Sequence, residues 1–123
     1  MEEHETGAHF IKEILMKTVI EDEIKSFVND VVNRFNPERI IMFGSHASGD
    51  ATPDSDVDIL VVMDFKSRPH QQSFEIRRAI KRSFPLDLLV RRPADIDRRL
   101  RLGDFFIKEI MQEGKVLYER TNS

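Results

Sequence analysis

Cysteine and tryptophan are absent from this 123-residue sequence, and glycine and proline occur only five times each. Without cysteine the chain forms no disulfide and offers no thiolate ligand to a metal, which fits a reducing compartment. No apolar run approaches the ~20 residues that a membrane helix needs. The acidic start, MEEHETGAH, differs from the basic start of a secretory signal. We therefore expect a cytoplasmic protein with no membrane contact.

The composition is that of one globular domain. Hydrophobic residues make up 40% of the chain and charged residues 33%, and a chain of this length forms one core rather than two. Its charge is uneven, with a net −8 over residues 1–60 and +5 over residues 61–123. A general nucleic-acid binder would carry an excess of positive charge, so a nucleic acid is not favoured as partner. The basic half suits an acidic partner or the phosphates of a nucleotide.

Helical periodicity runs through the first 35 residues. Apolar residues keep the spacing of one helix face over residues 8–19 and again over residues 24–35, which predicts two helices or one long helix bent near residues 18–21. Asn36-Pro37 should end the helix, because the residue before a proline disfavours the helical conformation. The first part is either an extra layer on the core or an interface with a partner or a second copy.

Beyond this helical region, strand-like apolar runs alternate with helical patterns. The expected strands cover residues 39–43, 57–63, 86–90 and 116–118, and the expected helices cover residues 71–83, 94–100 and 104–113, with a short helix starting near Ser45. Gly114 is expected to cap the last helix. This alternation predicts an α/β (α+β) fold, in which a small mixed β-sheet carries flanking helices.

Two acidic residues open the second expected strand. Asp56 and Asp58 should share one face, because side chains alternate along a strand, while Val57 and Ile59 turn to the buried face. Like charges this close repel, and a fold tolerates them most easily when a cation lies between them. Either aspartate alone would be an ordinary turn or edge residue. Together they indicate a functional site.

The spacing around these carboxylates resembles a known signature. Gly44-Ser45, then ten residues, then Asp56-x-Asp58 is similar to the motif of the polymerase-β-like nucleotidyltransferases. The small size and a third acidic strand, Leu86-Asp87-Leu88, resemble the minimal nucleotidyltransferase (MNT) branch. The resemblance implies the polymerase-β-like nucleotidyltransferase fold for a domain at residues 21–119. Residues 1–20 would then be a partly helical extension and residues 120–123 a tail.

The resemblance also implies a set of site residues. The positions that match catalytic and metal-binding residues, for two Mg²⁺ ions, are Asp56, Asp58 and Asp87, and those that match nucleotide-binding residues are Gly44, Ser45, His46 and Ser48. Mg²⁺ prefers such oxygen ligands, and glycine lets the backbone approach a phosphate closely. The family often has arginine where His46 and Ser48 stand. We therefore expect weaker or pH-sensitive binding of ATP.

The resembled branch often pairs with a HEPN-domain ribonuclease toxin. This implies an antitoxin that transfers AMP from ATP to a tyrosine of that partner. Two alternatives stay open: a non-catalytic antitoxin that acts by occlusion, and nucleotidyl transfer to RNA or a small molecule. The basic segments at residues 77–82 and 91–101 are either solvated faces or a docking surface for an acidic partner or a tRNA-like acceptor. Homo-oligomers are compatible with each alternative.

Overall fold

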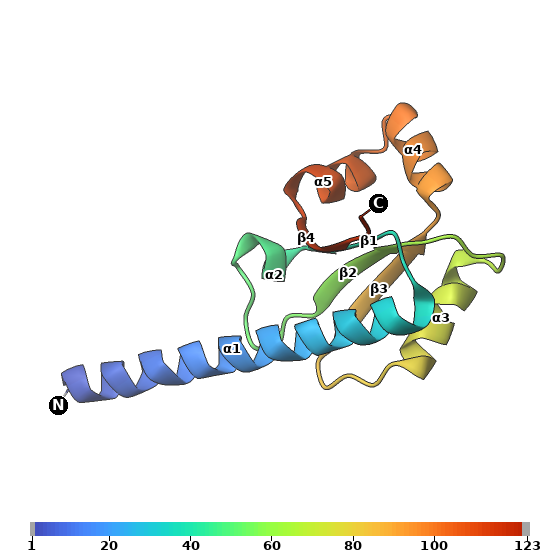
Figure 1. Ribbon diagram of the computed structural model, residues 1–123. Helices are drawn as coiled ribbons and strands as arrows, with labels where there is room; N and C mark the ends of the chain where they lie inside the picture. Colours follow the sequence, from blue (N-terminus) through green and yellow to red (C-terminus); the bar gives the residue numbers. More distant parts are fainter. Residues whose placement is uncertain (1, 122–123) are drawn as a thin grey trace.

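A mixed four-stranded sheet forms the centre of the computed structural model, which describes residues 2–121 (Figure 1). The strand order is β3-β2-β1-β4; β2 and β3 are parallel, whereas β1 is antiparallel to both β2 and β4. The strands are β1 (Arg39–Phe43), β2 (Val57–Val62), β3 (Leu86–Arg91) and β4 (Lys115–Glu119). The expected α/β fold with a small mixed sheet and flanking helices is confirmed.

Helices cover both faces of this sheet. They are α1 (Glu2–Phe35), α2 (Ser45–Ser48), α3 (Pro69–Ala79), α4 (Pro93–Arg101) and α5 (Phe105–Glu113). Figure 1 shows α1 and α3 on one side of the sheet and α4 and α5 on the other. No helix within residues 2–121 is long and apolar enough to cross a membrane.

The two faces of the sheet carry cores of different size. The core under α1 and α3 contains sixteen buried residues, among them Phe27 and Val31 of α1 and Ile59 of β2. The core under α4 and α5 contains six, including Leu60 of β2 and Ile107 of α5. Successive residues of β2 enter opposite cores because side chains alternate along a strand.

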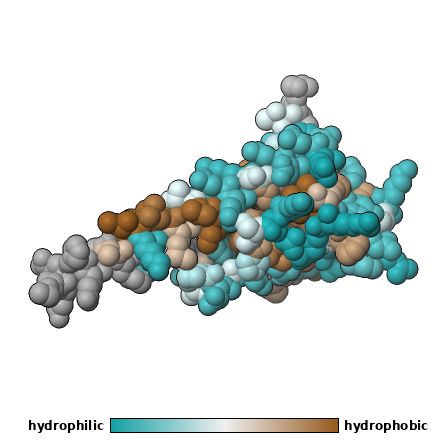
Figure 2. Space-filling model, turned by 90° about the horizontal axis from the view of Figure 1, so that it is seen from below, coloured by the Kyte–Doolittle hydropathy of each residue, from teal (hydrophilic) through white to brown (hydrophobic). Residues whose placement is uncertain are grey.

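Helix α1 is continuous from Glu2 to Phe35, so the alternative of two separate helices is wrong. It ends as expected before Pro37, and Asn36 takes the left-handed conformation with φ 49°. The second half packs on the core, whereas the first half extends beyond the sheet as a rod (Figures 1 and 2). The described side chains of residues 8–19 are all exposed, so this part adds no layer to the core.

Figure 2 shows apolar surface along this rod. The exposed apolar residues are Phe10, Ile11, Ile14, Leu15, Met16 and Val19. Their spacing in the sequence predicts a helix, and this prediction is confirmed. Spacing alone does not say whether an apolar face meets the core of the same chain.

Two later helices differ from the predicted ones. Helix α3 ends at Ala79 rather than at residue 83, because Ile80 is already extended, with φ −111° and ψ 119°, and its side chain is buried in the core. Phe74 of this helix is 62% exposed, although Ile76 and Ile80 are buried in the core. Helix α5 begins after Asp104, whose carboxylate accepts hydrogen bonds from the backbone N–H groups of Phe106 and Ile107. Gly114 follows α5 as expected.

Candidate active site

Parallel pairing of β2 and β3 brings two predicted site residues together. Asp58 and Asp87 are register partners on the two strands, and neighbouring strands lie about 4.8 Å apart. Both side chains lie on the same face as Leu60, whose core is covered by α4 and α5. Asp56 comes one residue before β2 and is exposed, as is Asp87, whereas Asp58 is half-buried.

The loop after β1 approaches Asp58 so closely that only glycine fits. Gly44 has φ 72°, in the left-handed region that other residues avoid, and a Cβ added there would lie 2.1 Å from Asp58 Oδ2. Phe43, the preceding residue, is the register partner of Asp58 on the antiparallel β1. The Gly-Ser motif and the Asp-x-Asp motif are therefore parts of one site.

The electrostatics of the site centre on Asp58. Burial raises the pKa of its carboxyl group above the ordinary value, the negative charge of Asp87 raises it further, and Asp56 adds a smaller contribution in the same direction. His46 opposes these effects and lowers the same pKa. The carboxylate form of Asp58 is thus destabilised by its surroundings, and a cation at this position would relieve the repulsion.

The remaining predicted residues belong to the single turn of α2. Ser45 is its first residue, and the Nε2 atom of His46 lies 3.2 Å from the carbonyl oxygen of Ser55. This contact ties α2 to the turn before β2. The hydroxyl of Ser48 donates to the carbonyl of Ser45 and to a carboxylate oxygen of Asp50, and is exposed to solvent. A helix of one turn has little dipole, so anion binding here would depend on individual N–H groups.

A cavity of about 420 Å³ opens beside Asp58. Gly44 and Ser48 line it on one side, and α5 forms the opposite wall. Its volume falls in the range of small-molecule sites. The α5 residues that line it are Phe106, Glu109, Ile110 and Glu113.

Sequence reasoning did not include these α5 side chains among the site residues. Phe106 packs edge-on against Phe43, with ring centroids 5.8 Å apart. Glu109 and Glu113 are four residues apart, so the sequence alone places both carboxylates on the same face of the predicted helix. That spacing is common on solvated helices, however, and only the tertiary fold brings it to the Gly-Ser loop.

The carboxylates of this site are oxygen ligands of the kind that Mg²⁺ prefers. Among residues 2–121 no group of three or more His, Asp or Glu side chains is arranged to hold a metal ion by itself. Mg²⁺ is usually bound by one or two carboxylates together with water and substrate phosphates. Asp58 and Asp87, with Asp56 nearby, fit an ion that takes its other ligands from a nucleotide.

Comparison with known proteins agrees with this geometry. The family described as Polymerase beta, Nucleotidyltransferase matches residues 22–123, which is most of the chain. The chain belongs to this family. The nucleotidyltransferase domain therefore contains the whole sheet and the second half of α1, whereas the exposed rod precedes the matched region.

Two relatives extend the comparison. The chain is 30% identical over 100 residues to a protein of Methanocaldococcus jannaschii that is named a putative protein adenylyltransferase; the match covers 80% of this chain and 97% of that protein. The fold of the present chain is similar to that in the crystal structure of a putative nucleotidyltransferase from Sulfolobus solfataricus, with a TM-score of 0.63 and 23% identity. That match covers 87% of this chain and 86% of the other. The structural likeness supports the nucleotidyltransferase fold.

Proposed function

We propose that this nucleotidyltransferase domain transfers AMP from ATP to a hydroxyl group of a partner protein, in a Mg²⁺-dependent reaction. The observation that carries the proposal is the pairing of Asp58 with Asp87 beside the Gly44 backbone. Phosphoryl transfer chiefly requires positioning and the stabilisation of negative charge. The pKa of Asp58, raised by burial and by the negative charges of Asp87 and Asp56, supports a role in holding a cation.

Each residue has a defined part in the proposed reaction. Bound Mg²⁺ would supply positive charge to the phosphoryl oxygens, with Asp56, Asp58 and Asp87 as its protein ligands. The acceptor oxygen forms a bond to the α-phosphorus, and the bond from that phosphorus to pyrophosphate breaks. Asp87 is exposed and is suited to orient the acceptor hydroxyl and to take its proton. Gly44 and Ser45 would bind the phosphates through backbone N–H groups.

We further propose that the acceptor belongs to a HEPN-type ribonuclease toxin, so that the chain acts as an antitoxin. The named relative from M. jannaschii, a putative protein adenylyltransferase, supports a protein as acceptor. The small size of the domain also supports it, because a single layered sheet offers little surface to grip an acceptor that is not brought by a partner.

A second candidate is a partner-binding antitoxin that acts by occlusion without catalysis. It is favoured by the α2 loop, where His46 contacts a backbone carbonyl and Ser48 bonds to Asp50, in place of the two arginines common in the family. These side chains would bind a triphosphate less strongly than guanidinium groups do.

The decisive experiment follows transfer of label from ATP labelled at the α-phosphate. Wild type, Asp58→Asn and Asp64→Asn would each be purified with a co-expressed partner and incubated with Mg²⁺. Asp64 is an exposed carboxylate just beyond β2 and serves as the matched control. Label on a protein band that is lost only in Asp58→Asn supports the proposal.

Other outcomes separate the alternatives. Label on RNA would show that the acceptor is a nucleic acid and not a protein. Toxin neutralisation by Asp58→Asn, with no label in any sample, would favour occlusion. Equal loss of label in both variants would contradict a specific role for Asp58.

A further inference from the structure

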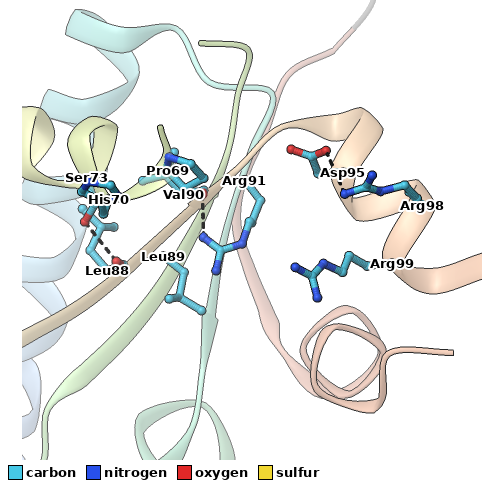
Figure 3. A pocket seen from close by; sticks show the side chains of 10 residues that line it. All are labelled: Pro69, His70, Ser73, Leu88, Leu89, Val90, Arg91, Asp95, Arg98 and Arg99. Carbon is cyan, nitrogen blue, oxygen red and sulfur yellow. Dashed lines mark hydrogen bonds and ion pairs between the residues drawn. The ribbon is translucent and has the colours of Figure 1, made fainter. Parts of the chain in front are cut away.

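A second cavity, of about 520 Å³, lies at the open edge of the sheet along β3. It is bounded by the start of α3 on one side and by α4 on the other (Figure 3). The polar residues that line it are His70, Ser73, Arg91, Asp95, Arg98 and Arg99. None of them belongs to the carboxylate site described above.

Three guanidinium groups face this cavity against one carboxylate. Arg91 comes from the end of β3, and Arg98 and Arg99 come from α4, so the cations are held by two separate elements (Figure 3). The carboxylate of Asp95 is 4.0 Å from Arg98 and 3.3 Å from Arg92. An excess of positive charge around a concave surface favours an anionic ligand.

The arginines retain donors for such a ligand. Arg91 donates from Nη1 to the carbonyl of Val90 at 2.8 Å, and Arg99 donates to Asp104 at 3.3 Å. A guanidinium group has five N–H donors in a planar fork, so these bonds leave most of the donors of each group available. Figure 3 shows the Arg91 and Arg99 side chains directed into the same space. A tetrahedral phosphate accepts hydrogen bonds from several directions at once and suits this arrangement.

The start of α3 completes the wall opposite α4. Pro69 occupies the first turn of this eleven-residue helix, and His70 follows it. Backbone N–H groups in the first turn of a helix lack helical partners and carry a partial positive charge. The hydroxyl of Ser73 donates to the carbonyl of Leu88 at 3.1 Å, which fixes its oxygen in the cavity wall. The backbone N–H groups at the start of the helix add to the attraction that the arginines exert on an anion, whereas Ser73, whose single hydrogen is donated to Leu88, does not.

The position of the cavity separates it from the site expected for ATP. Leu89 and Arg91 lie on the same face of β3 as Asp87; the cavity wall includes Leu88 and Leu89, next to Asp87 along the strand, whereas Arg91, the cation on β3, is four residues and about 13 Å from Asp87. The Gly44-Ser45 loop lies beyond β2, at the end of β1. An anion in the cavity would therefore be on the opposite side of Asp58 from that loop.

We propose that this cavity binds a phosphate group of a second ligand, in addition to the nucleotide expected at the carboxylate site. Two sources share this chemistry: a phosphate ester of about mononucleotide size, which the volume accommodates, and free inorganic phosphate. Binding depends on Arg91, Arg98 and Arg99 and needs no transfer reaction. The inference therefore stands or falls separately from the proposed activity.

The test is a titration of the full chain, without Mg²⁺, with AMP and separately with inorganic phosphate, followed by amide chemical shifts in NMR. Saturable shifts at Ser73, Leu89 and Arg91 are expected. Arg98→Gln should weaken binding of the tighter ligand about tenfold, as expected for the loss of a charge-assisted hydrogen bond. Arg98 is the suitable target because its side chain is 62% exposed and its removal disturbs little packing.

Arg82→Gln is the matched control, because it removes the same charge from an exposed position outside the cavity. It should change affinity by less than twofold. Tighter binding of AMP than of phosphate identifies an ester as the ligand, and equal binding identifies free phosphate. Equal weakening by both variants, or shifts confined to Gly44 and Ser45, would overturn the proposal.

Discussion

The two faces of the sheet differ in the size of the core that covers them and in the exposure of their charged residues. The face under α1 and α3 is closed by a core of sixteen buried residues, whereas the face under α4 and α5 has a core of six and leaves Asp56, Asp58 and Asp87 near solvent. Because β2 contributes to both, Val57, Ile59 and Val61 are buried in the larger core, while Asp58 on the other face lies in the proposed site. A strand can meet both demands since its side chains alternate.

This division separates loss of function from loss of stability. Substitutions in the core under α1 and α3 should lower the free energy of unfolding. Substitutions of Asp56, Asp58 or Asp87 should lower activity and leave the free energy of unfolding nearly unchanged.

Asp58→Asn should reduce nucleotidyl transfer by ~10³-fold or more, because it removes a charged ligand at the centre of the proposed cation site. The free energy of unfolding should stay the same or rise, since repulsion from Asp87 and Asp56 is relieved. Steady-state transfer assays and urea unfolding of the same preparation check both parts. A marked loss of stability would show that the two faces are not independent.

Phe27→Ala should lower the free energy of unfolding by about 3–5 kcal/mol, because it leaves a cavity in the closed face. The ring is 1% exposed and packs edge-on against Phe84, with centroids 5.8 Å apart. Phe105→Ala, at a position that is 84% exposed, is the control and should change stability by less than about 0.5 kcal/mol. Chemical denaturation measures both, and similar losses in the two variants would contradict the assignment of the core.

Gly44→Ala should cost more than Gly49→Ala, although both glycines have positive φ, 72° and 87°. The backbone strain, about 1–3 kcal/mol, is common to both positions. At Gly44 the new Cβ would also collide with the Asp58 carboxylate, whereas at Gly49 it would meet no atom within 4 Å. We expect a loss of transfer of at least tenfold for Gly44→Ala only. Equal activity in the two variants would refute the close approach of the loop to the carboxylate.

In the absence of metal, the Asp58 carboxyl should titrate above the ordinary pKa of an aspartate, and Asp87→Asn should lower this pKa by removing one cause of the shift. Because the pKa is raised in the folded state, the charged form costs stability above it. That cost should disappear as pH falls through the raised value. Carboxyl carbon NMR follows the titration, and an unchanged Asp58 pKa in the variant would be evidence against the pairing.

Much of the fold follows from local patterns in the sequence. Nearly continuous apolar runs such as Val57 to Val62 predict the strands, and the proline after Asn36 predicts the end of α1. Chain order alone cannot give the parallel register of Asp58 with Asp87, because pairing depends on which strands meet in the folded sheet. The motif suggested these residues as partners through family resemblance.

Other features are invisible to periodicity because they are tertiary. Helical spacing at Phe10 or Phe74 indicates an apolar face but not what covers it, and both side chains are 62% exposed. The same limit applies to Glu109, whose place in the cavity wall beside Asp58 depends on how α5 docks on the sheet.

The parallel pairing of β2 and β3 also sets the time at which the site comes into existence. Parallel neighbours require a crossover, and here the connection runs through α3 before β3 can join the sheet. On the ribosome, a chain that has emerged only as far as β2 would contain Asp56 and Asp58 but lack Asp87. The complete carboxylate set would form only after β3 has emerged and docked, so an unfinished chain would lack the carboxylate pair on which the proposed activity depends.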